Sequence, residues 1–311
     1  MRNPRIAVVG ATGAVGSVLR SILQDRGYDD VRYFASGRSA GSELDGRRVE
    51  EATPAALVSL DVDFAFFAVG AKASRELVPH AARSGAVCLD KSSAWRMEPD
   101  VPLVVPEVNG ERAFEHGGVI AVPNCSTIPL VCVLKPLHDV AGLVRVRVAT
   151  YQSASGAGAG RMATLRAEAP DEHDLAMDWD FDGEEFDEET KVRDETRKIM
   201  ELPDLPVSAT CVRVPVMVSH SEAVWIETEE PLAPEHAREV LEAAPGVRLE
   251  EFPSPRAAAG IDDVLVGRIR TDRADDRGLT FFLSADNLRK GAALNAVQIA
   301  ETLLAREALA A

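Results

Sequence analysis

Short apolar segments alternate with longer amphipathic segments over the first 125 residues of the chain. The pattern predicts strands at residues 5–9, 31–35, 62–69, 86–89 and 119–122, and helices at residues 15–24 and 74–83. The segment 62–69 is too uniformly apolar for a strand with one wet face, so we expect it to be buried on both sides. Alternation of this kind predicts an α/β fold built on a parallel, doubly wound sheet.

The pattern changes after residue 125. Residues 143–151 alternate Val and Arg, as in a strand with one face in water. Further strands are predicted at 210–218, 223–227, 264–270 and 279–285, and helices at 184–200, 234–243 and 288–308. This texture indicates an α+β domain on a largely antiparallel sheet. We therefore expect one domain from residues 1–125 plus 288–311, with the C-terminal helix returning to it, and a second from residues 126–287.

Composition and charge narrow the classes of function. The chain has 311 residues and a formal net charge of −16, which argues against nucleic-acid binding. Residues 171–189 carry eleven Asp or Glu and no Lys or Arg, so we expect a solvated, partly irregular surface segment there. No apolar run reaches the roughly 20 residues that span a membrane, and no signal peptide is expected at the amino end.

The four cysteines show neither a C-x-x-C spacing nor the density of a disulfide framework. We expect reduced thiols and a cytoplasmic location. No metal-binding residues are expected. Cys132 lies seven residues after Cys125 on a predicted helix, too far for a disulfide, and is expected to be part of the core.

A glycine-rich turn joins the first strand to the first helix. Its cofactor-binding candidates are Gly10, Thr12, Gly13, Ala14, Val15 and Gly16, in the spacing G-x-x-G-x-x-G. Glycines allow the backbone to approach a pyrophosphate, and the helix amino end offers unpaired N–H groups to it. The context predicts a Rossmann-type dinucleotide-binding domain; the alternative is a tight turn without a ligand.

The end of the second strand should contact the ribose of that dinucleotide. Enzymes that use NAD usually carry an acidic residue there, which binds the 2′-hydroxyl group. This chain instead has Arg38 between Ser36 and Ser39, and no acidic residue before Glu43. A guanidinium at this position favours a 2′-phosphate and therefore NADP over NAD; the alternative is an arginine of a surface loop.

Cys125 follows a strand of buried type and precedes a predicted helix that extends to about residue 140. The dipole and free N–H groups of a helix amino end stabilise a thiolate and lower its pKa. The position of Cys125 by itself is equally compatible with an inert buried thiol. A nucleophilic cysteine also needs a proton-transfer partner. Among the six His, His220 follows the predicted strand 210–218 and is therefore expected at a cleft, although a structural role is the alternative.

Taken together, these segments resemble the aspartate-β-semialdehyde dehydrogenase family along nearly the whole chain. The segments that carry the resemblance are residues 10–16, 36–41, 90–96, 102–109, 123–127, 151–156, 195–199, 213–222 and 285–292. The resemblance implies NADP-dependent interconversion of L-aspartyl-4-phosphate with L-aspartate-4-semialdehyde and inorganic phosphate. It also implies a homodimer, formed through the second domain, that works reductively toward lysine, threonine and methionine.

The resemblance also implies roles for single residues. Cys125 resembles the family's acyl-enzyme nucleophile, His220 its acid/base, and Gln152 the residue that orients substrate beside the thioester. The implied substrate-binding residues are Arg96 and Lys191 for phosphate, Arg213 for the substrate carboxylate, Glu188 for its ammonium group, and Asn124 in the same pocket. Ser155, Gly156 and Asn287 resemble contacts to the nicotinamide half of the cofactor.

Three features depart from the family pattern. Lys91 stands where Asn is usual, Ser219 stands where Gly usually precedes the histidine, and residues 160–184 form a short, acidic segment. Serine avoids backbone conformations that glycine permits, so Ser219 affects how His220 is aimed. Two alternatives stay open at this point: an enzyme similar to N-acetyl-γ-glutamyl-phosphate reductase, and a diverged, inactive homologue that acts as a binding partner.

Overall fold

The computed structural model of the chain describes residues 3–168, 173–275 and 277–310. The chain forms two compact units, Met1–Pro123 with Ala292–Ala311, and Asn124–Gly291. The sequence analysis placed the two boundaries after residues 125 and 287. With the division at Pro123, Cys125 lies in the second unit together with His220.

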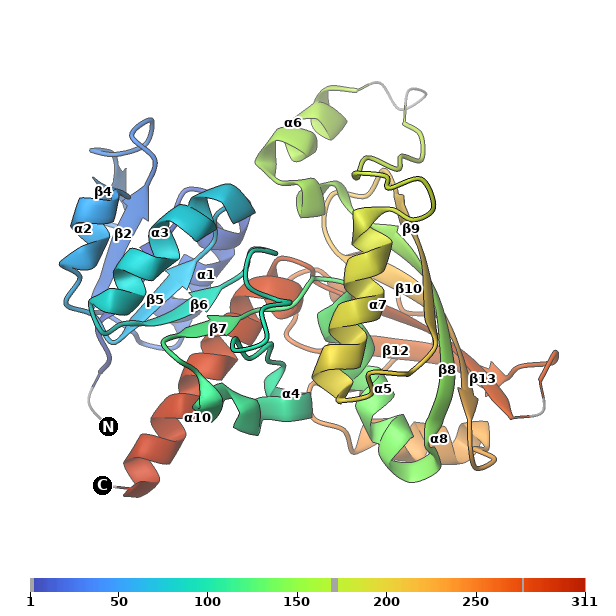
Figure 1. Ribbon diagram of the computed structural model, residues 1–311. Helices are drawn as coiled ribbons and strands as arrows, with labels where there is room; N and C mark the ends of the chain where they lie inside the picture. The colour runs from blue at the N-terminus through green and yellow to red at the C-terminus, as the bar shows by residue number, and fades with distance from the viewer. Residues whose placement is uncertain (1–2, 169–172, 276, 311) are drawn as a thin grey trace. The chain divides into compact units, whose positions relative to one another are not determined.

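The first unit contains a seven-stranded sheet in the order β3-β4-β2-β1-β5-β6-β7 (Figure 1). Its strands are β1 (Ile6–Val9), β2 (Val31–Ala35), β3 (Glu43–Leu44), β4 (Arg47–Glu51), β5 (Phe64–Phe67), β6 (Val87–Asp90) and β7 (Val119–Ala121). All pairs are parallel except β3 with β4. All four residues of β5 are buried, as expected for a strand covered on both faces. The predicted doubly wound parallel sheet is confirmed.

Helices cover both faces of this sheet. They are α1 (Ala14–Asp25), α2 (Pro54–Val58), α3 (Ala71–Arg83), α4 (Pro106–Asn109), the 3-10 helix η1 (Gly110–Glu115) and α10 (Leu294–Ala310). Ala7 and Val9 of β1 join one core cluster with Leu77 and Val78 of α3, while α1 packs against α10 (Figure 1). The carboxyl ends of β1, β2 and β5 therefore lie next to the glycine turn, where the Gly10 N–H donates to the carbonyl of Phe34 at 2.8 Å.

The second unit contains a six-stranded sheet in the order β11-β12-β13-β10-β8-β9. Its strands are β8 (Leu143–Gln152), β9 (Val207–Arg213), β10 (His220–Thr228), β11 (Val247–Leu249), β12 (Val264–Thr271) and β13 (Gly278–Ala285). The three central pairings are antiparallel and the two edge pairings are parallel. The predicted largely antiparallel sheet is confirmed, and β8 alternates between buried and exposed side chains as its sequence predicts.

The described helices of the second unit are α5 (Thr127–Ala141), the 3-10 helix η2 (Ala154–Ala157), α6 (Ala159–Ala167), α7 (Asp187–Met200), α8 (Pro234–Glu242) and α9 (Pro255–Ala258). Helix α5 contacts β10, β12 and β13, α7 contacts β9, and α8 contacts β11 and β12. Figure 1 shows α5 and α7 lying along the sheet. The predicted C-terminal helix is preceded by a π-helical turn, Arg289–Ala293.

Several predicted boundaries were wrong. The strand predicted over residues 210–218 ends at Arg213, because Pro215 has no N–H group for a ladder and Val216 bonds back to Val214 at 2.7 Å. The helix predicted from residue 184 begins at Asp187, where the Glu189 side chain accepts the Phe186 N–H at 3.0 Å.

The sequence analysis also missed several short elements, among them a hairpin and the helix α6. The hairpin β3–β4 turns at Asp45 and Gly46, both with positive φ, which is the Asp-Gly signal of a two-residue hairpin loop. The helix α6 begins at Ala159, directly after Gly158, which follows η2. In the described part of the chain, no helix is long and apolar enough to cross a membrane.

Candidate active site

Cys125 lies between β7 and α5, two residues before the first residue of the helix. Asn124 shapes this entry: its Oδ1 accepts the Ser126 N–H at 2.8 Å and its carbonyl accepts the Ile128 N–H at 3.0 Å. The half-buried thiol therefore lies at the amino end of a 15-residue helix, where the helix dipole stabilises a thiolate. The predicted position of Cys125 before a helix agrees with this.

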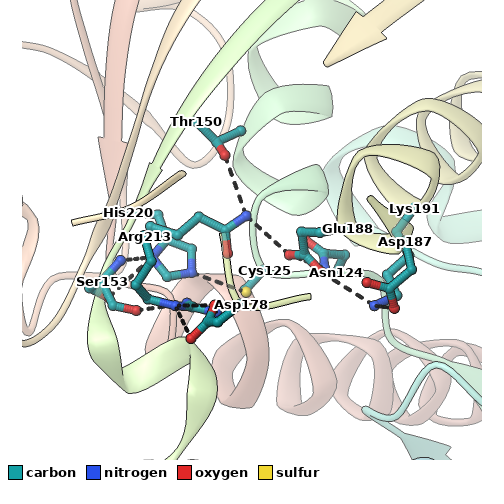
Figure 2. A network of polar contacts seen from close by, with 11 residues as sticks. Asn124, Cys125, Thr150, Ser153, Asp178, Asp187, Glu188, Lys191, Arg213 and His220 are labelled. Atoms are coloured by element: carbon teal, nitrogen blue, oxygen red, sulfur yellow. Dashed lines mark hydrogen bonds and ion pairs between the residues drawn. The ribbon is translucent and has the colours of Figure 1, made fainter. Parts of the chain in front are cut away.

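The sulfur of Cys125 lies 3.3 Å from Nε2 of His220 (Figure 2). His220 is the first residue of β10 and is 1% exposed, so it begins a strand rather than following one. The opposite ring nitrogen, Nδ1, accepts the backbone N–H of Ser153 at 3.0 Å and lies 3.1 Å from the Ser153 hydroxyl. Because Nδ1 accepts, the neutral ring carries its proton on Nε2, directed at the sulfur.

The amide oxygen of Asn287 joins the loops on either side of this imidazole. It accepts the hydroxyls of Ser153 at 3.2 Å and Ser155 at 2.9 Å, and the backbone N–H of Ser219 at 2.9 Å. All four residues are buried. Ser155 and Asn287, which the resemblance assigns to the nicotinamide, are thus also part of the scaffold of His220.

Ser219 adopts φ +76°, a left-handed conformation that favours glycine. The sequence departure at this position therefore falls on strained backbone directly before His220. Its hydroxyl is buried without a hydrogen-bond partner in the described structure. The strain is compatible with the aim of the imidazole, because His220 still reaches Cys125.

Glu188 connects three of the predicted substrate-binding residues. Its Oε1 accepts the side-chain amides of Asn124 at 2.9 Å and Gln152 at 3.0 Å, and its Oε2 lies 3.4 Å from Nζ of Lys191 (Figure 2). Glu188 is 5% exposed, so the prediction of a solvated segment through residue 189 is wrong at its carboxyl end. The carboxylate is buried because these donors compensate its loss of water.

Lys191 remains a cation in this setting. Burial by itself would lower the pKa of Lys191, but the carboxylates of Glu188 and Asp187 outweigh that effect and raise it. Asp187 lies 2.7 Å from Nζ of Lys191, one helical turn earlier on α7. A protonated ammonium that shares the Glu188 carboxylate with Asn124 and Gln152 can bind an anionic group.

Arg213 is a buried cation of this unit. Its Nη1 donates to the carbonyl of Ser153 at 3.1 Å, and its Nε and Nη2 donate to Oδ1 of Asp178 at 3.1 and 3.0 Å. A Cβ atom on Gly156 would lie 3.0 Å from Nη1 of Arg213 and 3.1 Å from Nε2 of His220. The backbone of Gly156 therefore fits tightly against both functional groups.

The glycine turn of the first unit has the geometry of a phosphate cradle. Gly10 has φ +91°, and a Cβ there would clash with the carbonyl oxygen of Ala68. A Cβ on Gly16 would clash with the carbonyl oxygen of Gly10. Helix α1 begins at Ala14 with Gly13 as its N-cap, without a side-chain cap or an acidic residue in its first turn. The remaining candidates of this turn are Thr12, which is exposed, and Val15, which is in the first turn of α1.

Arg38 follows β2 in the same unit. Its side chain is exposed, as is Ser36, and Ser39 is half-buried. Arg96 is 5% exposed and donates to the carbonyls of Val122 at 3.0 Å and Lys91 at 2.7 Å. The main-chain oxygen of Lys91, the second departure from the family pattern, thus helps to fix the Arg96 guanidinium.

The other cysteines lie in the core. Cys88, Cys132 and Cys211 are buried, as predicted for Cys132, and none of the four cysteines forms a disulfide. Burial raises the pKa of Cys88 and of Cys211 well above the ordinary range. Cys125 alone among the four thiols combines partial exposure with an imidazole neighbour.

Sequence reasoning missed Ser153, Asp178 and Glu195 as neighbours of these groups. Glu195 Oε2 accepts the backbone N–H of Asn124 at 2.6 Å and so supports the residue before the nucleophile. Ser153 carried a signal, because it lies next to Gln152 and within the segment 151–156 that resembles the family. Asp178 carried none, because it is one carboxylate within a long acidic run.

A dinucleotide-binding unit and an antiparallel unit with a Cys–His pair together define a dehydrogenase with a thiol nucleophile. The chain matches two family profiles, "Semialdehyde dehydrogenase, NAD binding domain" over residues 5–116 and "Semialdehyde dehydrogenase, dimerisation domain" over residues 134–290. The chain belongs to the aspartate-semialdehyde dehydrogenase family. Its members are NAD(P)-dependent oxidoreductases that act on aldehydes, so the predicted family and enzyme class are confirmed.

The similarity extends over whole chains. The aspartate-semialdehyde dehydrogenase of Aquifex aeolicus is 46% identical over 338 residues, which cover 98% of this chain and 99% of the relative. Aspartate semialdehyde dehydrogenase II of Vibrio cholerae, solved as a complex with ASA, is 38% identical with a TM-score of 0.91, covering 98% and 99%. The Candida albicans enzyme, solved with NADP, is 25% identical with a TM-score of 0.81, covering 98% and 99%.

Proposed function

We propose that the chain catalyses the NADP-dependent interconversion of L-aspartyl-4-phosphate with L-aspartate-4-semialdehyde and inorganic phosphate. The observation that carries this proposal is the 3.3 Å approach of the Cys125 sulfur to Nε2 of His220 at the amino end of α5. The relatives that this chain matches over nearly their full lengths are named aspartate-semialdehyde dehydrogenases. In the reductive direction the reaction serves amino-acid biosynthesis.

Cys125 is the nucleophile of the proposed reaction. Its thiolate attacks the acyl carbon of the phosphate ester, the C–S bond forms, and the C–O bond to phosphate breaks with release of inorganic phosphate. A thioester remains on Cys125, and one difficult displacement is thereby divided into two easier steps. NADPH, when bound, supplies the hydride that reduces this thioester to the aldehyde.

His220 stabilises the negative charge on the sulfur of Cys125. Its Nε2–H donates a hydrogen bond to the thiolate before attack, and again to the thiolate that leaves as the hemithioacetal collapses. The hydroxyl of Ser153 lies 3.1 Å from Nδ1, on the side of the ring that already accepts the Ser153 N–H. The buried ring keeps its orientation throughout because Ser153 and Asn287 support it.

The remaining site residues bind and orient the substrate. Lys191 and Arg96 are proposed to bind the phosphate, and Arg213 the substrate carboxylate, since a guanidinium fork suits a bidentate carboxylate. Glu188 is proposed to bind the substrate ammonium through Oε2, which already lies 3.4 Å from the ammonium of Lys191. Gln152 and Asn124, both fixed by Oε1 of Glu188, orient the acyl group beside Cys125.

The residues of the first unit fit an NADP molecule. The turn leaves no room for side chains at Gly10 and Gly16, and the uncapped amino end of α1 offers N–H groups to the pyrophosphate. Arg38 is proposed to bind the 2′-phosphate, with Ser36 and Ser39 beside it. Ser155, Gly156 and Asn287 are proposed to hold the nicotinamide.

We also propose a homodimer in the cytoplasm. The match to a dimerisation domain supports the dimer, as does the face of the second sheet that points away from α5. Tyr151 and Phe282 lie there with ring centroids 6.1 Å apart, beside Trp225. Sedimentation of the wild type is expected to give a mass near twice 33.4 kDa, and Phe282→Asp is expected to sediment as a monomer.

The proposed location in the cytoplasm is supported by the cysteines. Four cysteines without a disulfide fit a reducing compartment.

The activity is tested by oxidation of aspartate semialdehyde with NADP and phosphate, followed as NADPH absorbance. We expect turnover that requires phosphate and is lost in Cys125→Ser. Binding of NADPH without turnover would overturn the proposal in favour of a non-catalytic homologue. Turnover only with the semialdehyde of N-acetylglutamate would overturn the assigned substrate while leaving the chemistry of Cys125 in place.

A further inference from the structure

The guanidinium of Arg213 binds a carboxylate of its own chain. Oδ1 of Asp178 lies 3.1 Å from Nε and 3.0 Å from Nη2, and Oδ2 lies 3.4 Å from Nε. This two-nitrogen contact is the geometry in which arginine recognises carboxylates. Arg213 is 3% exposed, whereas the side chain of Asp178 is 37% exposed.

The neighbours of Asp178 hold it against this arginine. Ala176 and Arg213 exchange both backbone hydrogen bonds, at 3.0 and 2.8 Å, so the segment pairs with the last residue of β9. The ring of Trp179 lies over the guanidinium, 4.6 Å from its central carbon to the ring centroid. Two residues later, Phe181 pairs with Phe186, and their ring centroids are 5.1 Å apart.

A chain of contacts connects this ion pair to the reacting sulfur. Arg213 donates to the carbonyl of Ser153, whose N–H donates to Nδ1 of His220, and Nε2 of His220 faces Cys125 (Figure 2). Gly156 fits against both the guanidinium and the imidazole. Asp178 therefore places a carboxylate at the cation that we assign to the carboxylate of the substrate.

The Nε/Nη2 edge of Arg213 is closed to a second carboxylate in this arrangement. The Nε/Nη2 edge is taken by Asp178, Nη1 donates to Ser153, and Trp179 covers one face of the plane. We propose that Asp178 is a built-in competitor of the substrate, which occupies Arg213 in the ligand-free enzyme and leaves when a carboxylate ligand binds. This inference rests on the proposed function, because that function assigns Arg213 to a carboxylate.

The segment that carries Asp178 is suited to such displacement. Leu175, Met177 and Phe181 are 61%, 53% and 59% exposed, so the segment buries little apolar surface that its movement would expose. Competition of this kind reduces the apparent affinity for substrate by the fraction of enzyme in which Arg213 is open. It leaves kcat unchanged, because Asp178 is absent from the site once substrate is bound.

The test compares Asp178→Asn with Asp180→Asn, which makes the same charge change two residues along the same segment. Succinate serves as a dicarboxylate probe, titrated while the fluorescence of Trp179 is followed; Trp179→Phe identifies the signal against Trp95 and Trp225. We expect Asp178→Asn to bind succinate about 3- to 10-fold more tightly, and to lower KM for aspartate semialdehyde by a similar factor without a change in kcat. Asp180→Asn is expected to match the wild type.

An unchanged or weakened succinate affinity in Asp178→Asn would overturn the proposal, since Asp178 would then only orient Arg213. The two proposals fail separately. Tighter succinate binding in Asp178→Asn without any oxidation of aspartate semialdehyde would refute the proposed reaction and support the competition. Normal turnover with identical KM values in the two variants would support the reaction and refute the competition.

Discussion

The backbone N–H of Ser153 donates to Nδ1 of His220 at 3.0 Å. A backbone donor cannot rotate away, so it fixes which nitrogen of the neutral imidazole carries the proton. Nε2 then presents that proton to the sulfur of Cys125 at 3.3 Å. This relationship makes His220 a hydrogen-bond donor to the thiolate in the resting state.

Removal of this imidazole should mainly affect the chemical step. We expect His220→Asn to lower kcat about 100- to 10,000-fold, as loss of a positioned acid/base does, with a smaller change in KM. The measurement is steady-state turnover of aspartate semialdehyde. His236→Asn, at a ring that is 57% exposed, is the matched control and should be unaffected. A loss below about tenfold would contradict the assigned role of His220.

The strained residue before the histidine should tolerate glycine. Ser219→Gly removes the left-handed strain of φ +76° and a buried hydroxyl without a recorded partner, and we expect the free energy of unfolding to rise by about 1 kcal/mol. Urea denaturation measures the change. Ser84→Gly is the control, since Ser84 has φ −74° and gains nothing from glycine. Equal destabilisation of both variants would show that Ser219 is not strained.

Iodoacetamide should distinguish Cys125 from the core thiols. Burial raises the pKa of Cys88 and Cys211, so both stay protonated at neutral pH, and a thiol is a poor nucleophile. We expect one adduct per folded chain at pH 7, located at Cys125 by peptide mass mapping and absent in Cys125→Ser. Modification of Cys88 or Cys211 at a comparable rate in the folded protein would contradict this.

The buried carboxyl of Glu222 should make stability depend on pH. Burial raises its pKa well above the ordinary value, and in the described structure neither carboxyl oxygen has a hydrogen-bond partner. The folded state therefore holds a proton that the unfolded chain releases, and stability falls as pH rises above the ordinary glutamate range. In Glu222→Gln this fall is removed.

Thermal melts of the wild type and Glu222→Gln at pH 5, 6.5 and 8 measure this effect. We expect the Tm of the variant, relative to that of the wild type, to increase from pH 5 to pH 8. The corresponding difference in the free energy of unfolding grows by up to about 1.4 kcal/mol per pH unit. All other titrating groups are shared, so the difference isolates Glu222. A Tm difference that does not change with pH would show that the carboxyl ionises normally.

Arg38 should decide between the two dinucleotides. Loss of a charge-assisted contact to the 2′-phosphate is expected to lower kcat/KM for NADP about 10- to 100-fold in Arg38→Ala, with little change for NAD. Arg48→Ala, another arginine of the same unit, is the control. An equal loss with both cofactors would place Arg38 away from the 2′-phosphate.

Patterns with a local cause were predictable from the sequence. The apolar run of β5 and the Val/Arg alternation of β8 follow directly from burial on two faces and on one. The glycines at 10 and 16 signal close backbone contacts that no other residue permits. The Asp45–Gly46 hairpin had an equally local signal, because Asp-Gly is typical of a two-residue hairpin loop.

Pairings across long sequence separations were not predictable. Asp178 and Arg213 are 35 residues apart, and nothing in an acidic run shows which of its carboxylates will meet a buried guanidinium. The charge pattern placed Glu188 in a solvated segment for the same reason, and only the resemblance to the family assigned it to the substrate pocket. Its burial depends on donors from Asn124 and Gln152, which only the folded second unit brings to it.

The single amide oxygen of Asn287 accepts three hydrogen bonds from two separate stretches of chain: the hydroxyls of Ser153 and Ser155, and the backbone N–H of Ser219 directly before His220. A substitution there withdraws the same acceptor from the loop after β8 and from the start of β10 at once. A change at position 287 that alters a contact to the nicotinamide would therefore also alter the orientation of the His220 imidazole. The amide cannot be retuned for one without disturbing the other, so change in cofactor preference has more freedom at Arg38 than at this residue.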